Sequence, residues 1–380
     1  MTFSRRSQVG STETNALTLA LASARAEARF LDLTASNPTT AGLPYDQAAI
    51  LSALDQRAAL VYEPQPLGLA SAREVVAKRL GIDPARVAIT ASTSEAYAVL
   101  FKAFCDPGDE VLVPSPSYPL LDWLASFEGI TLRRYPLVYA GSWHVDVEAL
   151  ARAVGPKTRA IVAVAPNNPT GQYLSAHELD AMLAHELPVI SDEVFASYPL
   201  ATRRSDRLAT VVHAKEGLVF ALSGLSKLAA LPQMKLGWIA AGGDPARVNE
   251  ALARLELVLD AYLSVGAPVQ HALPELLHAG ELTADAIRRR TKDNLAVARA
   301  AAAKHDLVTQ LDVEAGWYVT WRVPATMSDE EWALTLLRED GVYVHPGYFF
   351  DMSGAHLVLS LLTPEPDFRD GIERIVRRIR

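Results

Sequence analysis

The sequence predicts an α/β protein with a mostly parallel sheet in a large three-layer domain and a smaller α+β domain. From Val87 onward, short and continuous apolar runs alternate with helical patterns. Continuous apolar strands between helices are typical of a parallel sheet whose two faces are both covered. At about Gly266 the pattern changes to long helical stretches followed by a few isolated strands. This change indicates that a second, smaller unit follows the sheet domain.

Six apolar runs form the predicted sheet. Helical patterns over residues 94–104 and 174–183 separate several of them. Runs of this length, bounded by turn residues, favour buried strands over helices. The predicted strands are residues 87–89, 111–113, 160–164, 189–190, 219–222 and 236–241.

The two ends of the chain supply the predicted small domain. Residues 12–29 predict a helix, and residues 30–33 a short strand that ends at the Asn37-Pro38 turn. After Gly266 we expect helices over 268–277, 281–305, 328–340 and 367–379, with strands at 317–321, 342–344 and 357–361. The large domain is therefore expected at 45–262, and the small domain at 1–44 and 263–380.

Composition excludes several classes of function. The chain has 380 residues, a formal net charge of −8 and no dense basic cluster, so nucleic acid and anionic membrane are poor partners. The run Arg288–Arg290 is expected to form a solvated helix face. A single cysteine, Cys105, excludes an internal disulfide and a multi-cysteine metal site, and no metal is predicted. Without a long apolar run or a signal-peptide pattern, a cytoplasmic location is expected.

Two charged residues follow predicted strands. Lys227 lies in Ser223-Gly224-Leu225-Ser226-Lys227, directly after an apolar strand, and Asp192 ends the strand before it. In parallel sheets ligands bind outside the carboxyl ends of the strands. A desolvated lysine amine there can act as a nucleophile or base, and an aspartate can hold a cationic ring nitrogen. Each residue alone also fits a plainer interpretation, a surface lysine or a helix-capping aspartate.

Three further segments follow strands of the same sheet. Ser92, Thr93 and Ser94 open a helix, where hydroxyls and free backbone N–H groups can bind an anion or simply cap the helix. Asn168 lies in Asn167-Asn168-Pro169-Thr170-Gly171, which is either a turn or a source of an amide for a ligand. Tyr118 can stack on a planar ring or pack in the core. A planar, phosphorylated pyridinium aldehyde would use all five features together.

The order of these segments identifies a resemblance to the class I/II aminotransferases, which are fold type I pyridoxal-phosphate enzymes. The resemblance extends over nearly the whole chain. The matching segments are Asn37-Pro38-Thr39 and residues 62–68, 91–96, 107–111, 116–119, 167–171, 191–193 and 223–237.

The resemblance implies a role for each matching residue. Lys227 would form the Schiff base with pyridoxal 5'-phosphate and then act as general base and acid. Asp192 would pair with the pyridine nitrogen, and Tyr118 would stack on the ring. The resemblance further implies phosphate contacts by Ser92, Thr93, Ser94, Ser223 and Lys235, a phenolic-oxygen contact by Asn168, and substrate contacts by Ser36 and Asn168. Tyr62 would reach the phosphate of a neighbouring subunit, which implies a homodimer with shared active sites.

The expected function is amino transfer between an amino acid or amine and a 2-oxo acid. A lyase or another pyridoxal-phosphate reaction on the same scaffold is the alternative, because the cofactor contacts do not fix the reaction's outcome. A non-catalytic ligand sensor is a weaker alternative. Such sensors add an N-terminal DNA-binding unit, whereas here a short segment precedes the first predicted strand.

The chain departs from the family pattern around the cofactor. Phe195 replaces a tyrosine that donates to the phenolic oxygen, and a phenyl ring cannot donate. Gly224 replaces the usual serine, so Ser223 is the expected hydroxyl. Lys235 replaces an arginine and loses the bidentate fork.

The substrate side departs further, because the arginine that grips the α-carboxylate aligns with Val358. Either another cation binds the carboxylate or the substrate lacks one. The candidate substitutes are Arg5, Arg6, Arg322 and His356.

Overall fold

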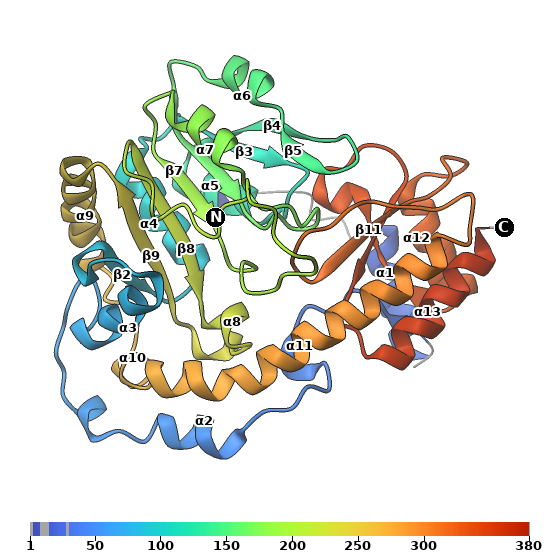
Figure 1. Cartoon of the computed structure of the whole chain (residues 1–380), viewed down its shortest axis with the longest axis horizontal. Helices are drawn as coiled ribbons and strands as arrows, with labels where there is room; N and C mark the ends of the chain where they lie inside the picture. Colours follow the sequence, from blue (N-terminus) through green and yellow to red (C-terminus); the bar gives the residue numbers. More distant parts are fainter. Residues whose placement is uncertain (1–2, 8–14, 28–29, 380) are drawn as a thin grey trace.

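The computed structural model describes residues 3–7, 15–27 and 30–379. Within them the chain forms an eight-stranded sheet, a four-stranded antiparallel sheet and a two-stranded parallel pair (Figure 1). The large sheet lies between helices, and the smaller sheet packs with the chain's C-terminal helices. This arrangement confirms the predicted α/β fold with a smaller α+β part.

The large sheet has the strand order β2-β9-β8-β7-β6-β3-β4-β5. Neighbours from β8 to β4 are parallel, whereas β9 runs antiparallel to β2 and β8, and β5 antiparallel to β4. The strands are β2 Val87–Thr90, β3 Glu110–Ser115, β4 Thr131–Tyr139, β5 Trp143–Val145, β6 Thr158–Val164, β7 Val189–Asp192, β8 Leu218–Gly224 and β9 Gly237–Gly243. All six predicted strands are present.

Strands β4 and β5 were not predicted. Strand β4 carries the exposed residues Arg133 and Arg134 in its middle, so it has no continuous apolar run. A strand near the sheet edge buries only part of its surface, and the pattern that identifies central strands is then missing.

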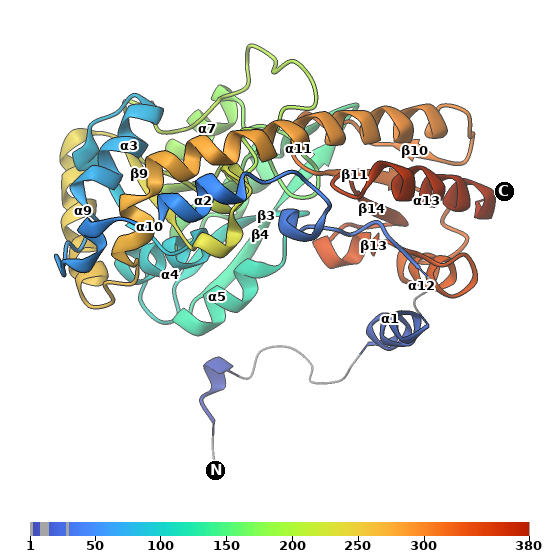
Figure 2. The ribbon, with the colours of Figure 1, turned by 90° about the horizontal axis from the view of Figure 1, so that it is seen from below.

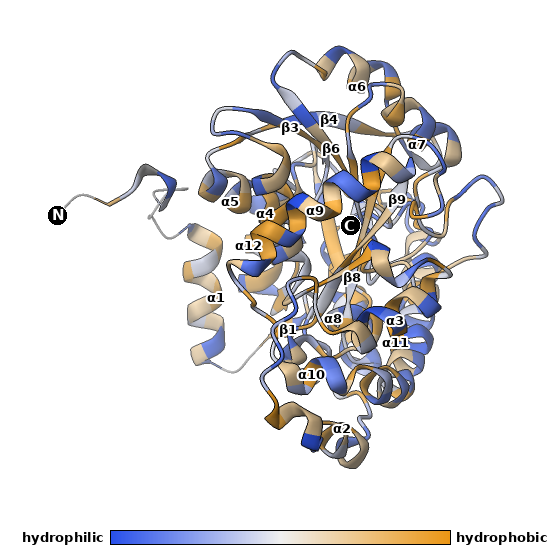
Figure 3. Ribbon diagram, turned by 90° about the vertical axis from the view of Figure 1, so that its left-hand side faces the viewer, coloured by the Kyte–Doolittle hydropathy of each residue, from blue (hydrophilic) through white to orange (hydrophobic). Residues whose placement is uncertain are grey.

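Helices cover both faces of the large sheet. Two apolar clusters lie on opposite faces, because neighbouring side chains of a strand alternate: Val111 and Leu112 belong to different clusters. Figure 3 shows hydrophobic colour on central strands such as β8, with helices of mixed hydropathy around them. The helices between residues 47 and 271 are α2 Gln47–Ala53, α3 Ala70–Leu80, α4 Thr93–Phe104, α5 Leu120–Glu128, α6 Val147–Ala153, α7 Ala176–Leu183, α8 Leu225–Leu228, α9 Pro245–Asp260 and α10 Ala267–His271.

A separate apolar cluster holds the smaller part together, with Trp321, Trp332 and Phe368 fully or almost fully buried. Its sheet has the order β10-β11-β14-β13, and α1 lies against α12 (Figure 2). The elements are α1 Ala16–Ala26, β1 Leu31–Asp32, β10 Thr309–Gln310, β11 Tyr318–Arg322, α12 Asp329–Glu339, β12 Val342–Tyr343, β13 His345–Pro346, β14 His356–Ser360 and α13 Glu365–Arg378.

Helix α11, Leu273–Ala302, joins the two parts (Figure 1). Its first half contributes Leu276 and Ile287 to a cluster on the large sheet, and its second half contributes Leu295 and Ala298 to the smaller core. One continuous helix thereby fixes the two sheets relative to each other.

One predicted strand is shorter than expected, and one local prediction was wrong. The strand predicted at 30–33 is limited to Leu31–Asp32, while the ends of the predicted 12–29 helix at 12–14 and 28–29 lie outside the described residues. Arg290 is not on a solvated face: its guanidinium donates to the carbonyl oxygens of Ala41, Gly42 and Leu362. The guanidinium thereby supplies hydrogen-bond donors to three main-chain carbonyl oxygens.

A buried ion cluster ties the loop after β7 to the sheet. The Arg207 side chain is 2% exposed and contacts Glu314 Oε1 at 3.0 Å and Glu178 Oε2 at 3.4 Å. The two carboxylates also accept backbone N–H groups of Tyr173 and Val145. The charges are therefore paired and hydrogen-bonded, as burial requires.

We expect Arg207→Met to lower the free energy of unfolding by about 3–5 kcal/mol, because it leaves two buried carboxylates without their cation. Arg204→Met is the matched control: Arg204 approaches the same Glu314 oxygen at 3.5 Å, but 46% of its side chain is exposed. Its loss should change stability by less than about 1 kcal/mol. Denaturant unfolding of both variants measures the difference, and equal effects would contradict the role of Arg207.

Candidate active site

Strand pairing brings the predicted residues to one edge of the large sheet. Asp192, the last residue of β7, pairs with Val164 of β6 on one side and Leu222 of β8 on the other. Asn168 follows β6 after a short loop, and Lys227 lies in α8, Leu225–Leu228, directly after β8. The amide, the carboxylate and the amine thus come from three adjacent strands.

The Asp192 carboxylate is held by two donors. The Tyr97 hydroxyl of α4 donates to Oδ2 at 3.3 Å, and the Val194 backbone N–H donates to Oδ1 at 3.2 Å. Burial raises the pKa of Asp192 to about 6, although these hydrogen bonds and the charge of Lys227 oppose the rise. At neutral pH the carboxylate is therefore mostly ionised and able to accept from a cationic ring nitrogen.

Lys227 carries the amine of the site. Burial lowers its pKa to about 8, and the attraction of Asp192 opposes that change. No direct ion pair joins Lys227 and Asp192 within the described part of the chain. Instead, Nζ lies 4.6 Å from the ring centroid of Trp317 and 5.7 Å from that of Phe195. An amine with this pKa is partly unprotonated near neutral pH and can act as a nucleophile.

At Gly237, the backbones of two residues predicted to contact the phosphate, Ser92 and Ser223, lie close together. Gly237 pairs with Thr90 of β2 and Gly224 of β8. A Cβ at Gly237 would lie 3.1 Å from both the Ser223 carbonyl oxygen and the Ser92 carbonyl carbon, so a larger residue would require the backbone of one neighbour to shift.

The N-terminus of α4 lies beside Gly237. Ser92 is its N-cap and accepts from the Glu95 backbone N–H at 3.2 Å, while Thr93 and Ser94 form the first turn. Partly exposed hydroxyls and backbone N–H groups at a helix N-terminus suit a phosphate. Lys235, two residues before Gly237, is exposed and adds a positive charge to the segment.

Asn167 and Asn168 have different surroundings. The Asn167 side-chain amide donates to the Pro116 carbonyl and to Thr170 Oγ1, at 3.0 and 2.7 Å. The Asn168 Oδ1 atom is buried and has no hydrogen-bond partner in the described structure. A buried amide oxygen is normally paired with a donor, so the Asn168 Oδ1 atom can accept a hydrogen bond from a ligand, and the Nδ2 group of the same amide can donate one. With the carboxylate, the amine and the α4 N-terminus, this donor set fits pyridoxal phosphate.

Tyr118 and Ser36 meet at a third residue, Tyr318 of β11. Burial raises the pKa of Tyr318, the neighbouring Tyr118 raises it further, and the Ser36 hydroxyl lowers it. Tyr118 follows β3 and is half exposed. The N-terminal segment is therefore brought to the substrate side of the sheet edge.

Tyr62 does not lie with the other predicted site residues of its own chain. It is 83% exposed and lines a surface cavity of ≈ 200 Å³ together with Ile89, Leu259 and Leu263. A contact to a cofactor phosphate would have to come from another subunit.

The candidate substitute cations lie in different places. Arg6 packs beside Gly129 at the C-terminal end of α5, the opposite end from Tyr118, and the Arg5 side chain lies outside the described structure. Val358 is fully buried and faces Thr320 across the strand pair. Arg322 is two residues from Thr320 on β11, so the two side chains point to the same face of the sheet. Val358 on β14 pairs with Thr320 and therefore lies on that face as well. Arg322 pairs with His356 and is exposed.

Sequence analysis did not identify Trp317 and Tyr97 as site residues. Both are buried aromatics in apolar segments, which predict core packing and nothing more. Only their position relative to Lys227 and Asp192 indicates a role in the site. The local sequence around each residue does not predict that position.

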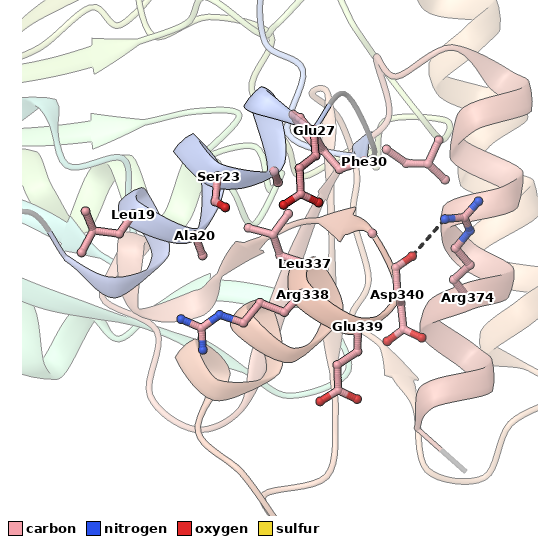
Figure 4. A pocket seen from close by; sticks show the side chains of 13 residues that line it. Leu19, Ala20, Ser23, Glu27, Phe30, Leu337, Arg338, Glu339, Asp340 and Arg374 are labelled. Carbon is pink, nitrogen blue, oxygen red and sulfur yellow. Dashed lines mark hydrogen bonds between the residues drawn. The ribbon is translucent and has the colours of Figure 1, made fainter.

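A larger surface cavity of ≈ 940 Å³ lies away from this edge, between α1 and the α12–α13 region (Figure 4). Leu19, Glu27 and Arg338 line it, and the Arg374 guanidinium donates to the Asp340 carbonyl at its rim. It shares none of the residues described above.

The sequence model of the family described as aminotransferase class I and II matches residues 28–375, so the chain belongs to that family of pyridoxal-phosphate enzymes. Alanine aminotransferase of Mycobacterium tuberculosis is 29% identical over 54% of this chain. S-alkyl-thiohydroximate lyase of Arabidopsis thaliana is 30% identical over 56% of it. The chain spans about half the length of these curated relatives.

The fold agrees with solved structures. Alanine aminotransferase from Pyrococcus furiosus superposes with a TM-score of 0.85 at 22% identity, covering 100% of this chain and 99% of the other. This similarity confirms the fold type I architecture predicted from the sequence.

The raised pKa of Asp192 predicts a pH-dependent stability. Folding favours the protonated carboxyl, so its contribution is full below pH about 4 and is lost as the pH rises through about 6. We expect Asp192→Asn to stabilise the cofactor-free protein by up to about 3 kcal/mol at pH 7 and hardly at all near pH 4. Thermal unfolding across this range measures the change. The exposed Asp312→Asn variant is the control, and a pH-independent gain at Asp192 would contradict the assignment.

Proposed function

We propose that the protein is a pyridoxal-phosphate-dependent aminotransferase that moves an amino group between an amino compound and a 2-oxo acid. One observation carries the proposal: Lys227, with its lowered pKa, lies after the strand next to the one that ends in the partly buried carboxylate of Asp192. Family membership and the names of the relatives support the same reaction.

Each side chain has a proposed task toward the cofactor. Lys227 would hold it covalently, Asp192 would accept from its ring nitrogen, and Asn168 would donate to its phenolic oxygen. Its phosphate would lie at the α4 N-terminus, with Ser92, Thr93, Ser94, Ser223 and Lys235. When bound, the group supplies an aldehyde that condenses with amines and a ring that withdraws electrons from the substrate.

The chain's own residues then move and hold protons. Once its amine is free, Lys227 takes a proton from the substrate Cα and returns it, which its pKa of about 8 suits. Asp192 keeps the ring nitrogen protonated. Because Phe195 has no hydroxyl, Asn168 is left as the side-chain donor to the phenolic oxygen.

We also propose a homodimer in which Tyr62 completes the partner's phosphate site. Exposed apolar side chains support an interface: Leu60, Val61, Tyr62, Tyr262 and Leu263 are between 38% and 87% exposed. Clusters of this kind mark interaction surfaces in soluble proteins. The domain division at 45–262, with 1–44 and 263–380, and the cytoplasmic location remain part of this proposal. No described helix combines the length and apolarity needed to span a membrane.

A lyase reaction is the second candidate, because one relative is named a lyase. The two reactions share the cofactor contacts and differ in what happens to the substrate's other bonds. Product analysis separates them: an aminotransferase converts an added 2-oxo acid to its amino acid, whereas a lyase releases a fragment without a second amino acceptor.

We expect borohydride reduction of the cofactor-loaded protein to fix one pyridoxyl group on Lys227, and Lys227→Ala to abolish both that adduct and turnover. The exposed Lys304→Ala variant is the control and should keep both. Peptide mapping of the reduced protein provides the measurement. An adduct on another lysine would overturn the assignment, and an adduct on Lys227 without amino transfer would leave only the cofactor role standing.

Arg322 is the proposed substitute for the carboxylate-binding arginine, because it shares a sheet face with Val358 and is exposed. We expect Arg322→Ala to weaken binding of an amino acid at least about tenfold, about 1.4 kcal/mol, and to leave the matching decarboxylated amine unaffected. Spectral titration of the loaded protein with alanine and ethylamine measures both affinities. Arg338→Ala, an exposed arginine on α12, is the control. Equal losses for the two ligands would rule out a carboxylate contact.

A further inference from the structure

The Lys227 ammonium lies near two aromatic rings. Its Nζ is 4.6 Å from the centroid of the Trp317 ring and 5.7 Å from that of Phe195. A cation within about 6 Å of a ring face is attracted by the ring's quadrupole, most strongly for tryptophan and in desolvated surroundings. Trp317 is 0% exposed and Lys227 is only partly exposed, so water screens this contact less than it would at the surface.

The surrounding residues fix the Trp317 ring firmly relative to Lys227. The rings of Phe195 and Tyr198 meet it edge to face, with centroids 5.4 and 5.1 Å away. The Tyr198 hydroxyl donates to the Lys227 carbonyl oxygen, and the Gly316 N–H donates to the Tyr198 carbonyl at 2.9 Å. The same tyrosine therefore holds the lysine backbone and the tryptophan segment.

The charge that acts on Lys227 comes from a different element than the Trp317 ring does. Asp192 on β7 is the charge that acts on it, and the Tyr97 hydroxyl from α4 is bonded to that carboxylate. The neighbouring Glu193 turns away and accepts the Val211 backbone N–H at 2.8 Å. The loop after β7 and the start of β11 present rings to the amine instead, through Phe195 and Trp317.

We propose that Trp317 is a positioning residue for Lys227: its ring face holds the ammonium form of the lysine whenever the amine is not covalently bonded. The catalytic meaning of this contact rests on the proposed function, but the contact itself does not. The ring opposes the effect of burial on Lys227, so weakening its π face favours the neutral amine. Shape-preserving changes to the ring therefore shift the titration of Lys227 without a cavity or a new hydrogen bond.

The test uses the cofactor-free full chain with mono-, di- and trifluorinated tryptophan placed at position 317 by nonsense suppression. Fluorine withdraws electron density from the ring face and leaves its shape nearly unchanged. The pKa of Lys227 is read from the pH dependence of its labelling by an amine-reactive reagent, quantified by peptide mass spectrometry. The same series at Trp321 is the control, since Trp321 is fully buried in the apolar cluster of the smaller part, whereas Trp317 belongs to a cluster on the large sheet.

We expect the Lys227 pKa to fall stepwise with each fluorine at Trp317, by roughly one unit in total, and to stay constant in the Trp321 series. A pKa that does not move in the Trp317 series, or that moves equally in both, overturns the proposal. Because no turnover is measured, this result is independent of whether the protein is an aminotransferase. The borohydride mapping of Lys227 tests that separately.

Discussion

The structure depends on holding two opposite charges near each other without letting them pair. Asp192 and Lys227 lie at the ends of neighbouring parallel strands, and the register of β7 with β8 sets their separation. Burial raises the pKa of the carboxylate and lowers that of the amine, so both charged forms cost free energy that a direct ion pair would largely recover. Hydrogen bonds from Tyr97 and Val194, and the rings under Lys227, keep the two groups apart.

That arrangement requires rigid surroundings, and the fold supplies them from both sheets. Helix α11 is part of the core beneath the large sheet and of the core of the smaller one. The Arg207 cluster fixes the Glu314 segment, whose backbone leads directly to Trp317. A small shift of β11 would therefore move the ring away from the amine, which links the stability of the smaller part to the chemistry at the sheet edge.

Sequence patterns predicted the central strands because each is buried on both faces and reads as a continuous apolar run. They also placed Lys227, Asp192 and Asn168 at strand ends, since residue order and parallel topology suffice for that. They missed β4, whose exposed Arg133 and Arg134 interrupt the apolar pattern. Sequence patterns could not predict the contacts of Trp317 and Arg290, because both residues contact residues that are distant in sequence. The roles of all the site residues, Tyr62 and Lys235 included, remain predictions.

Two of the four departures from the family pattern, Phe195 and Val358, lie on the same side of the site. Phe195 packs against Trp317 and Tyr318 at the start of β11, and Val358 pairs with Thr320 on the same strand. Each replaces a polar or charged group with an apolar one, so this side of the site is more apolar than the family pattern. Fields act more strongly in such surroundings, because the local dielectric constant is lower. The few charges that remain near this side, Asp192, Lys227 and the exposed Arg322, therefore carry more of the electrostatic work than they would in a polar site.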